Sequence, residues 1–348
     1  MTNNIHIVGL GARTPLGLNV EASMAAVRAG IAQIEEHPFI LDRQGEPVRL
    51  ATDPELNPLS MGPERLTEMA ETALAEVCTT LGGKAPNLGN IPLFLGLPEE
   101  RPGWTKNDMQ VVHNQLTQKS FPLKLDPIEL LPYGHAAGLL AVEAACQKIQ
   151  AGKEQICVIA GVDSYVNFET LEWLDQNKQL ATPYHRGAFF PGEGVGAVAL
   201  ASDSIVRRYG LTTLGMVKGI GTAIEPHKIK TDTVCVGEGL TTCIRKAVSG
   251  FQFPDEAIDG IICDINGERY RSEEWGFALL KLPEVFSDPT GYDLPTSCWG
   301  DVGAASGPLS MSMAVNAAQK GWGKGKRYLI WNSSETGQRA AASIEMNS

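Results

Sequence analysis

The chain has 348 residues, of which 43% are hydrophobic and 20% charged, as in a globular protein with a large buried core. Its 29 Lys and Arg residues against 40 Asp and Glu residues give a formal net charge of −11, which argues against nucleic acid and anionic membranes as partners. The seven cysteines include no Cys-x-x-Cys pair, so neither a metal site nor a disulfide framework is expected. No apolar run approaches about 18 residues and no signal-peptide pattern is present, so we expect a cytoplasmic protein.

The first half of the chain alternates strands and helices. Residues 5–11 predict a buried strand that ends in glycine, and Thr14–Gly17 predicts a turn. Asn19 is placed to cap a helix that continues to residue 29. The further expected elements are a helix over 67–79, a strand over 92–97, a helix over 136–150, and strands over 156–161 and 195–200.

The second half repeats this order. The expected elements are a strand over 214–221, a helix over 239–248, a strand over 261–265, a helix over 303–319 and a strand over 328–331. The helix–strand pairs 136–161 and 304–332 look like copies of one unit. We therefore predict two α/β halves with mixed sheets, residues 1–205 and 206–348.

Four segments resemble the β-ketoacyl-acyl-carrier-protein synthases of the thiolase superfamily. They are Val8–Gly17 (the opening strand and turn), Gly187–Gly196 (the G-E-G signature), Gly138–Gly152 with Val158–Gly161 (the helix and strand after the nucleophile), and Asn332, Ser333 and Gly337 (the C-terminal loop). The resemblance implies a thiolase-like five-layer αβαβα sandwich made of two similar halves, commonly dimerised across a central sheet. Gly9-x-Gly11 alone would also suit a dinucleotide site, but the third glycine of that motif is missing.

The resemblance also indicates which residues stand at the family's catalytic positions. His135 occupies the place of the nucleophilic cysteine, Asn266 and Asp301 the places of the two histidines, and Thr296 that of a lysine. An imidazole can accept an acyl group, but acyl-imidazoles hydrolyse readily and a helix N-terminus disfavours imidazolium. A packed or hydrogen-bonded His135 is the favoured interpretation. Asp301 as a carboxylate would repel an oxyanion, so we expect none of these residues to support condensation.

Several other residues could have either a catalytic or binding role or a purely structural one. Cys298 is the fallback nucleophile of a Cys298–His135–Asp301 arrangement, although a buried cysteine is the simpler interpretation. By resemblance, Glu193 lies near the floor of the ligand site, and Thr336 and Gly337 lie in its C-terminal loop. The remaining candidates, His185, Arg186 and His227, are explained equally well or better as loop residues.

These observations favour a catalytically degenerate ketosynthase-like protein that acts as a partner subunit, adaptor or scaffold, as chain-length-factor subunits do. The alternative is an acyltransferase, 3-oxoacyl synthase or thioesterase with non-standard catalytic residues, acting on acyl-carrier or acyl-CoA thioesters. The expected partners are a second copy or another ketosynthase-like subunit, and an acyl carrier protein. No cofactor is expected.

Overall fold

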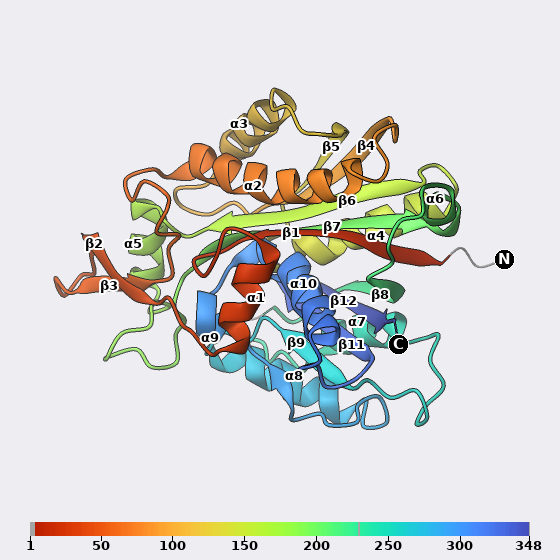
Figure 1. Ribbon diagram of the computed structural model, residues 1–348. Coiled ribbons are helices and arrows are strands. Elements are labelled where there is room, and N and C mark those ends of the chain that lie inside the picture. The colour runs from red at the N-terminus through yellow and green to blue at the C-terminus, as the bar shows by residue number, and fades with distance from the viewer. Residues whose placement is uncertain (1–3, 229, 348) are drawn as a thin grey trace.

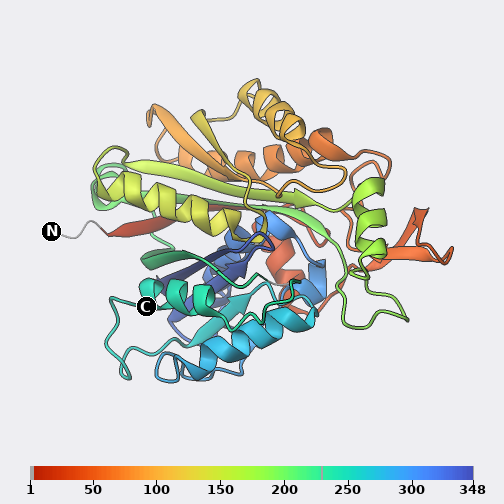
Figure 2. The same cartoon turned by 180° about the vertical axis from the view of Figure 1, so that it is seen from behind.

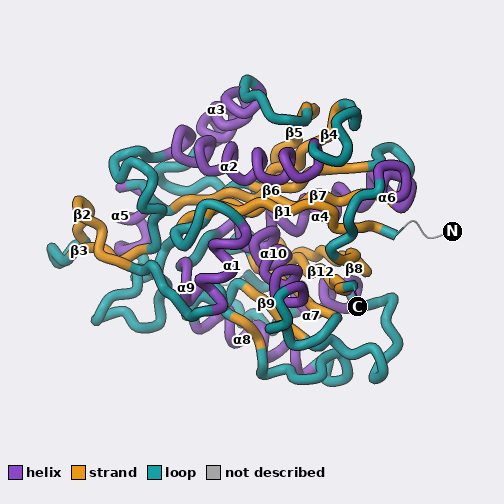
Figure 3. The backbone as a smooth tube through the Cα atoms, in the orientation of Figure 1, coloured by secondary structure: helices purple, strands orange, loops and turns teal. Residues whose placement is uncertain are grey.

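The computed structural model describes residues 4–228 and 230–347. Its main sheet has ten strands: β1 (Ile5–Arg13), β4 (Asn90–Gly96), β5 (Lys124–Leu131), β6 (Ile156–Ser164), β7 (Glu193–Ser202), β8 (Gly215–Ile224), β9 (Gly260–Cys263), β10 (Tyr292–Asp293), β11 (Arg327–Ser333) and β12 (Gln338–Met346). A separate hairpin, β2 (Glu35–Leu41) and β3 (Pro47–Leu50), projects from the body of the molecule (Figure 3).

The α-helices lie between and outside these strands. They are α1 (Val20–Arg28), α2 (Gly62–Gly82), α3 (Lys106–Thr117), α4 (Ala137–Gln150), α5 (Phe168–Gln176), α6 (Asp203–Tyr209), α7 (Glu238–Ala247), α8 (Arg269–Leu280), α9 (Thr296–Trp299) and α10 (Ser306–Gln319). Each strand and helix predicted from the sequence is present, with bounds shifted by a few residues. Asn19 caps α1 as predicted, since its side chain accepts a hydrogen bond from the backbone N–H of Ala22 at 2.9 Å.

The strand order is symmetric about one junction. On one side it runs β1-β7-β6-β4-β5, and on the other β8-β12-β11-β9-β10. Both halves have the mixed sheet that the sequence predicts, because β4 and β6 run parallel, as do β9 and β11, while the remaining inner neighbours run antiparallel. Antiparallel pairing of Ile5–Ile7 with Gly215–Val217 joins the two halves.

Helices make three layers around the two half-sheets (Figures 1 and 2). α2 and α3 cover the outer face of the first half-sheet, α4 and α10 lie between the half-sheets, and α7 and α8 cover the outer face of the second. The predicted five-layer αβαβα sandwich is confirmed. Within the described residues, no helix combines the length and apolar character needed to cross a bilayer.

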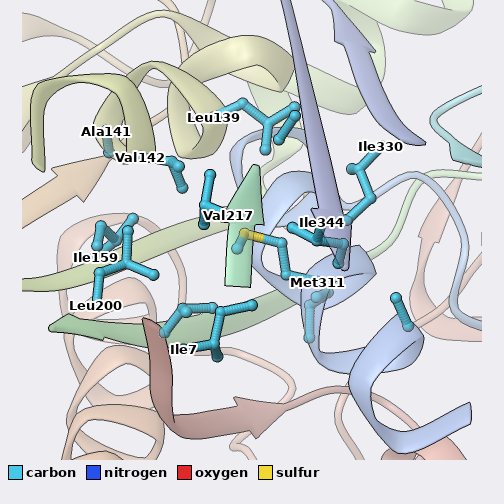
Figure 4. Packing of buried hydrophobic residues seen from close by; sticks show 14 of the residues in the cluster. Ile7, Leu139, Ala141, Val142, Ile159, Leu200, Val217, Met311, Ile330 and Ile344 are labelled. Carbon is cyan, nitrogen blue, oxygen red and sulfur yellow. The ribbon is translucent and has the colours of Figure 1, made fainter. Parts of the chain in front are cut away.

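Strands such as β6 and β9 are buried along their whole length because each face packs on a helical layer. On β6, Cys157 and Ile159 point into the central core, and Val158 and Ala160 into the outer core beneath α2. Figure 4 shows the central core, where Leu139 and Val142 of α4 lie near Ile159 and Val217. Burial between two layers explains why these strands read as continuous apolar runs.

Candidate functional site

The starts of the two central helices meet at the middle of the molecule. Each helix follows a single 3₁₀ turn, Gly134–Ala136 before α4 and Gly303–Ala305 before α10. Gly134 (φ +60°) and Gly303 (φ +46°) both adopt the left-handed conformation that glycine tolerates best. A Cβ on Gly303 would also lie 2.0 Å from an oxygen of Asp163, so no larger residue fits there.

His135 is fixed in the first of these turns. Its Nε2 lies 2.8 and 2.9 Å from the two carboxylate oxygens of Asp301, and 3.2 Å from a guanidinium nitrogen of Arg271. Because Asp301 only accepts and Arg271 only donates, the two short carboxylate contacts indicate that Nε2 carries a proton and donates it to Asp301. His135 as a whole residue is 6% exposed, so its contacts with Asp301 and Arg271 are buried.

The electrostatics follow from this contact. Burial lowers the pKa of His135, but the Asp301 carboxylate more than compensates, so the pKa is raised above its ordinary value. Burial would raise the pKa of Asp301, yet His135 and Arg271 hold it well below its ordinary value. The expectation that the helix start disfavours imidazolium is therefore reversed here, because a carboxylate lies at bonding distance.

Asp301 has further donors. Asn266 Nδ2 donates to it at 2.6 Å, and the backbone N–H of Gly303 at 2.9 Å. Arg271 is fully buried and lies 3.2 Å from a carboxylate oxygen of Asp264, while it donates to the carbonyl of Ser333 at 2.8 Å. The resulting network joins residues from both halves of the chain.

A cavity of about 350 Å³ opens beside His135. Its lining comprises Glu99, Glu100, Arg101, Gly134, His135, Asp163, Tyr165, Trp173, Leu174, Phe189, Lys228, Thr231, Glu335 and Thr336. None of the seven cysteines, all of which are described, contributes to it. A hollow of about 460 Å³ between α3 and β5 is larger, but its charged side chains Lys119, Lys124 and Asp126 are exposed.

Two carboxyl groups in this cavity have partners from distant segments. Glu99 accepts a short hydrogen bond from Thr336 Oγ1, and burial raises its pKa although Thr336 opposes that shift. Glu335 pairs with Lys230, whose ammonium also lies 3.2 Å from Glu268. Arg101, which also lines the cavity, pairs with Asp163 at 2.6 Å.

The structure brings together only part of the set predicted from the sequence. Asp301 contacts His135, Asn266 donates to Asp301, and Thr336 lines the cavity. Thr296 instead donates to the carbonyl of Ile265 at 2.8 Å, outside the cavity lining.

Cys298 is also separate from His135. Its sulfur lies 3.8 Å from Ser297 Oγ on α9, and the residue is buried outside the cavity lining. The Cys298–His135–Asp301 arrangement is therefore incomplete, because the contact between His135 and Asp301 is present but the thiol does not join it.

Glu193 and Gly337 lie outside the lining as well. Glu193 is fully buried and accepts two hydrogen bonds of 2.6 Å from Arg65 and one of 2.7 Å from the backbone N–H of Asp53. Its role in this structure is to hold neighbouring segments together. Among the loop candidates, His185 bonds within its own loop and His227 is exposed.

Sequence reasoning missed Glu99, Arg101, Asp163, Tyr165 and Arg271. A signal for some of them exists, since Glu99 and Asp163 follow the apolar runs of β4 and β6. These strands are parallel and adjacent, so polar residues at their carboxyl ends reach the same edge of the sheet. Arg271 has no such signal, because the apolar side chains of α8 form no stripe from which its buried face could be identified.

One cluster outside the cavity has metal-binding residue types. Among the described residues, ligand atoms of Glu225, Cys235 and Glu274 lie within 4.8 Å of one another. However, Glu274 accepts hydrogen bonds from Arg339 at 2.6 Å and from Ser333 at 3.0 Å. A buried guanidinium on the same carboxylate disfavours a second cation, so we assign no metal to this cluster.

Comparison with known proteins agrees with this architecture. Residues 134–204 match the family described as "Beta-ketoacyl synthase, N-terminal domain". No curated protein sequence matches the chain.

Several solved structures are similar over nearly the whole chain. A type II polyketide acyl carrier protein in complex with its ketosynthase (AntDE:AntF) gives a TM-score of 0.83 at 13% sequence identity, with 100% of both chains covered. The ishigamide ketosynthase/chain length factor gives 0.80 at 16% identity, again with 100% of both chains covered. The ketosynthase from module 6 of the bacillaene synthase from Bacillus subtilis 168 gives 0.79 at 15% identity, covering 99% of this chain and 72% of that one.

Identities this low establish the fold, while the matched segment begins one residue before His135 and includes the G-E-G motif. The resemblance that the motifs indicate is thereby confirmed: the chain has the fold of these ketosynthases, and its residues 134–204 match the N-terminal domain of the β-ketoacyl synthases.

Proposed function

We propose that this chain is a ketosynthase-like subunit without condensing activity, which serves as a partner subunit, adaptor or scaffold. One observation carries the proposal: the cavity at the head of α4 presents an imidazole held by a carboxylate, and no cysteine lines it. Covalent transfer through a cysteine requires its thiolate in contact with the substrate. Burial disfavours the thiolate at two of the cysteines, since it raises the pKa of Cys157 to about 12 and that of Cys78 to about 11.

The remaining polar groups also oppose condensation. Carbon–carbon bond formation from a malonyl group requires donors for a developing enolate. Asp301 stays ionised beside His135, and its negative charge would destabilise such an anion. Asn266, which could donate one hydrogen bond, already donates to Asp301.

The similar structures support a role in assembly. One is a ketosynthase/chain length factor and another is a ketosynthase in complex with an acyl carrier protein. We extend both kinds of partner to this chain: a second copy or another ketosynthase-like subunit, paired through the open edge of β5, and an acyl carrier protein. A cytoplasmic location and a role in fatty acid or polyketide biosynthesis belong to the same proposal.

The absence of condensation can be tested directly. Purified protein incubated with acyl-carrier and malonyl-carrier thioesters should give no β-ketoacyl product by mass spectrometry, whereas an intact synthase under the same conditions provides the positive control. Product formation that His135→Ala abolishes would show that the chain is a condensing enzyme.

The assembly proposal has its own measurement. Light scattering after size-exclusion chromatography should give twice the chain mass for the protein alone, or the mass of a heterodimer when an intact synthase is co-expressed with it. A single-chain mass under both conditions would contradict the partner-subunit role.

A further inference from the structure

Two polar atoms of largely buried residues have no partner. Tyr165 is 5% exposed and His135 6%, and both line the cavity. Within the described part of the chain, neither the Tyr165 hydroxyl nor His135 Nδ1 takes part in a hydrogen bond, and neither is among the unpaired polar atoms that are sealed from solvent, so both keep surface that is open to the cavity. Such groups are available to a ligand.

The orientation of His135 gives its free nitrogen a definite role. Because Nε2–H is donated to Asp301, the neutral imidazole presents the lone pair of Nδ1 to the cavity. A carboxylate that holds one imidazole nitrogen while the other faces the reactants is the arrangement of a general base. Asp301 is thus a positioning residue, and His135 is the group that would contact the reactants.

Tyr165 supplies the complementary group. Its ring lies under the guanidinium of Arg101, 4.2 Å from the ring centroid, and packs edge-on against Phe189. These contacts fix the ring and leave its hydroxyl free to donate to an oxygen on which negative charge develops. At this position the Arg101 cation partly offsets the Asp301 carboxylate, which would oppose such an anion. The apolar side chains of Trp173, Leu174 and Phe189 line the same cavity and could hold an acyl chain.

We propose that this cavity hydrolyses acyl thioesters, with His135 as the general base for a water nucleophile and Tyr165 as the hydrogen-bond donor to the carbonyl oxygen. This activity goes beyond the role as a non-condensing subunit and does not depend on it.

The reaction needs no cofactor and balances as follows. His135 Nδ1 takes a proton from water as the water oxygen forms a bond to the carbonyl carbon. The carbonyl π electrons move onto oxygen, where Tyr165 donates. When the carbonyl re-forms, the carbon–sulfur bond breaks, the electron pair goes to sulfur, and Nδ1–H returns its proton to the thiolate. The products are a carboxylic acid and a free thiol.

The test uses the full chain and hexanoyl-N-acetylcysteamine as the probe, with hexanoic acid measured by chromatography. Wild-type protein should release acid faster than buffer alone. His135→Gln should lower the rate about 100-fold or to the buffer rate, because a positioned general base contributes on the order of 10²–10⁴-fold. Tyr165→Phe, which removes only the hydroxyl, should lower it about 100-fold, the loss typical of one oxyanion donor.

Two variants serve as matched controls. Tyr209→Phe removes a hydroxyl that bonds to the Asn87 carbonyl outside the cavity, and Cys298→Ala removes the only thiol proposed as a nucleophile. Both should keep the wild-type rate. Thermal unfolding of each variant separates a chemical loss from a folding defect.

The role of Asp301 can be tested by the pH dependence of the hydrolysis rate, which a purely structural role would leave unchanged. The charged groups facing His135 are Asp301 and Arg271, with Asp264 and Glu99 further away. Since Asp301 favours the protonated imidazole, Asp301→Asn should shift the rise of the hydrolysis rate to lower pH. An unchanged pH profile would remove Asp301 from the proposal.

Other results would overturn the hydrolase itself. They are a wild-type rate equal to that of buffer or of His135→Gln, a rate that Tyr165→Phe leaves unchanged, or a rate lost in Cys298→Ala. None of these outcomes affects the proposed subunit role, which rests on the condensation assay and the measured mass.

Discussion

The contact between His135 and Asp301 joins one ionisable side chain from each half of the chain. Each group favours the charged form of the other, which is why the pKa of the histidine rises while that of the aspartate falls. Opposite shifts of this kind make the contact a source of stability only where both groups are charged. The chemistry of the site and the stability of the fold therefore depend on the same pair.

The sign of the pH dependence follows from the two shifts. His135 has a raised pKa, so its contribution is complete below the ordinary value of 6.5 and is lost as pH rises through the folded value. Asp301 has a lowered pKa, so its contribution is complete above the ordinary value of 3.8 and is lost in acid. The free energy of unfolding of the wild-type protein should therefore exceed that of the Asp301→Asn variant by the largest amount between pH 3.8 and pH 6.5. Urea unfolding of both proteins at about pH 5.5 and pH 9 measures this difference at each pH. A difference that is larger at the higher pH would contradict the argument.

A second buried pair, Arg65 and Glu193, is purely structural. Both side chains are 1% exposed or less, and two hydrogen bonds of 2.6 Å join them. Glu193→Gln keeps the shape but leaves the guanidinium uncompensated, so we expect a loss of about 3–5 kcal/mol in the free energy of unfolding. Urea denaturation measures it, with the exposed Glu55→Gln as the control. A loss below about 1 kcal/mol would be evidence that the pair is not needed.

The sequence identifies part of this site and misses the rest for a physical reason. Motif resemblance places His135, Asn266 and Asp301 at one centre, and the structure brings these three together. It cannot show that Arg271 fills the space beside them or that Tyr165 faces the cavity, because neither lies in a recognisable motif. Their positions depend on how the two halves pack, which local pattern does not encode.

At the scale of elements, the central helices approach the strands closely because several contact residues are glycines. A Cβ on Gly161 of β6 would lie 2.1 Å from the carbonyl oxygen of Ala304, in the 3₁₀ turn before α10. On α4, a Cβ at Gly138 would lie 2.3 Å from Pro308. These positions hold the two 3₁₀ turns, and hence His135 and Gly303, at a fixed separation.

Gly161→Ala tests this close approach. The added methyl group must displace the backbone at Ala304, so we expect a loss of about 1–3 kcal/mol in the free energy of unfolding. Gly187→Ala is the matched control, because a Cβ there meets nothing within 4 Å. Urea denaturation of both variants gives the comparison, and equal stabilities would mean that the turn can move at little cost.

Periodicity predicts the elements that face two apolar layers and misses those with mixed surroundings. Strands such as β6 and β9 are buried on both faces and read as unbroken apolar runs. α8 escapes detection because its apolar residues do not gather on one side, and its buried face includes Arg271 and Glu274. β12 is not predicted because its core residues include three successive alanines, Ala340–Ala342, which have little strand propensity.

At the scale of the whole molecule, the repeated strand order supports two halves of similar topology. We propose that they divide at residues 205 and 206, a point that lies within α6. The cavity takes residues from both halves, for example Tyr165 from the first and Glu335 from the second. Neither half alone would then enclose a binding site.

The two edge strands of the ten-stranded sheet differ in length. β10 has only two residues, Tyr292–Asp293, whereas β5 has eight, Lys124–Leu131, of which the four after Pro127 form an unbroken run of N–H groups. Docking of another strand needs several consecutive backbone groups, so only the β5 margin is long enough to extend the sheet. Once two molecules pair through β5, no edge strand of comparable length is left for a third molecule. Such a fold permits a closed pair and resists growth into fibres.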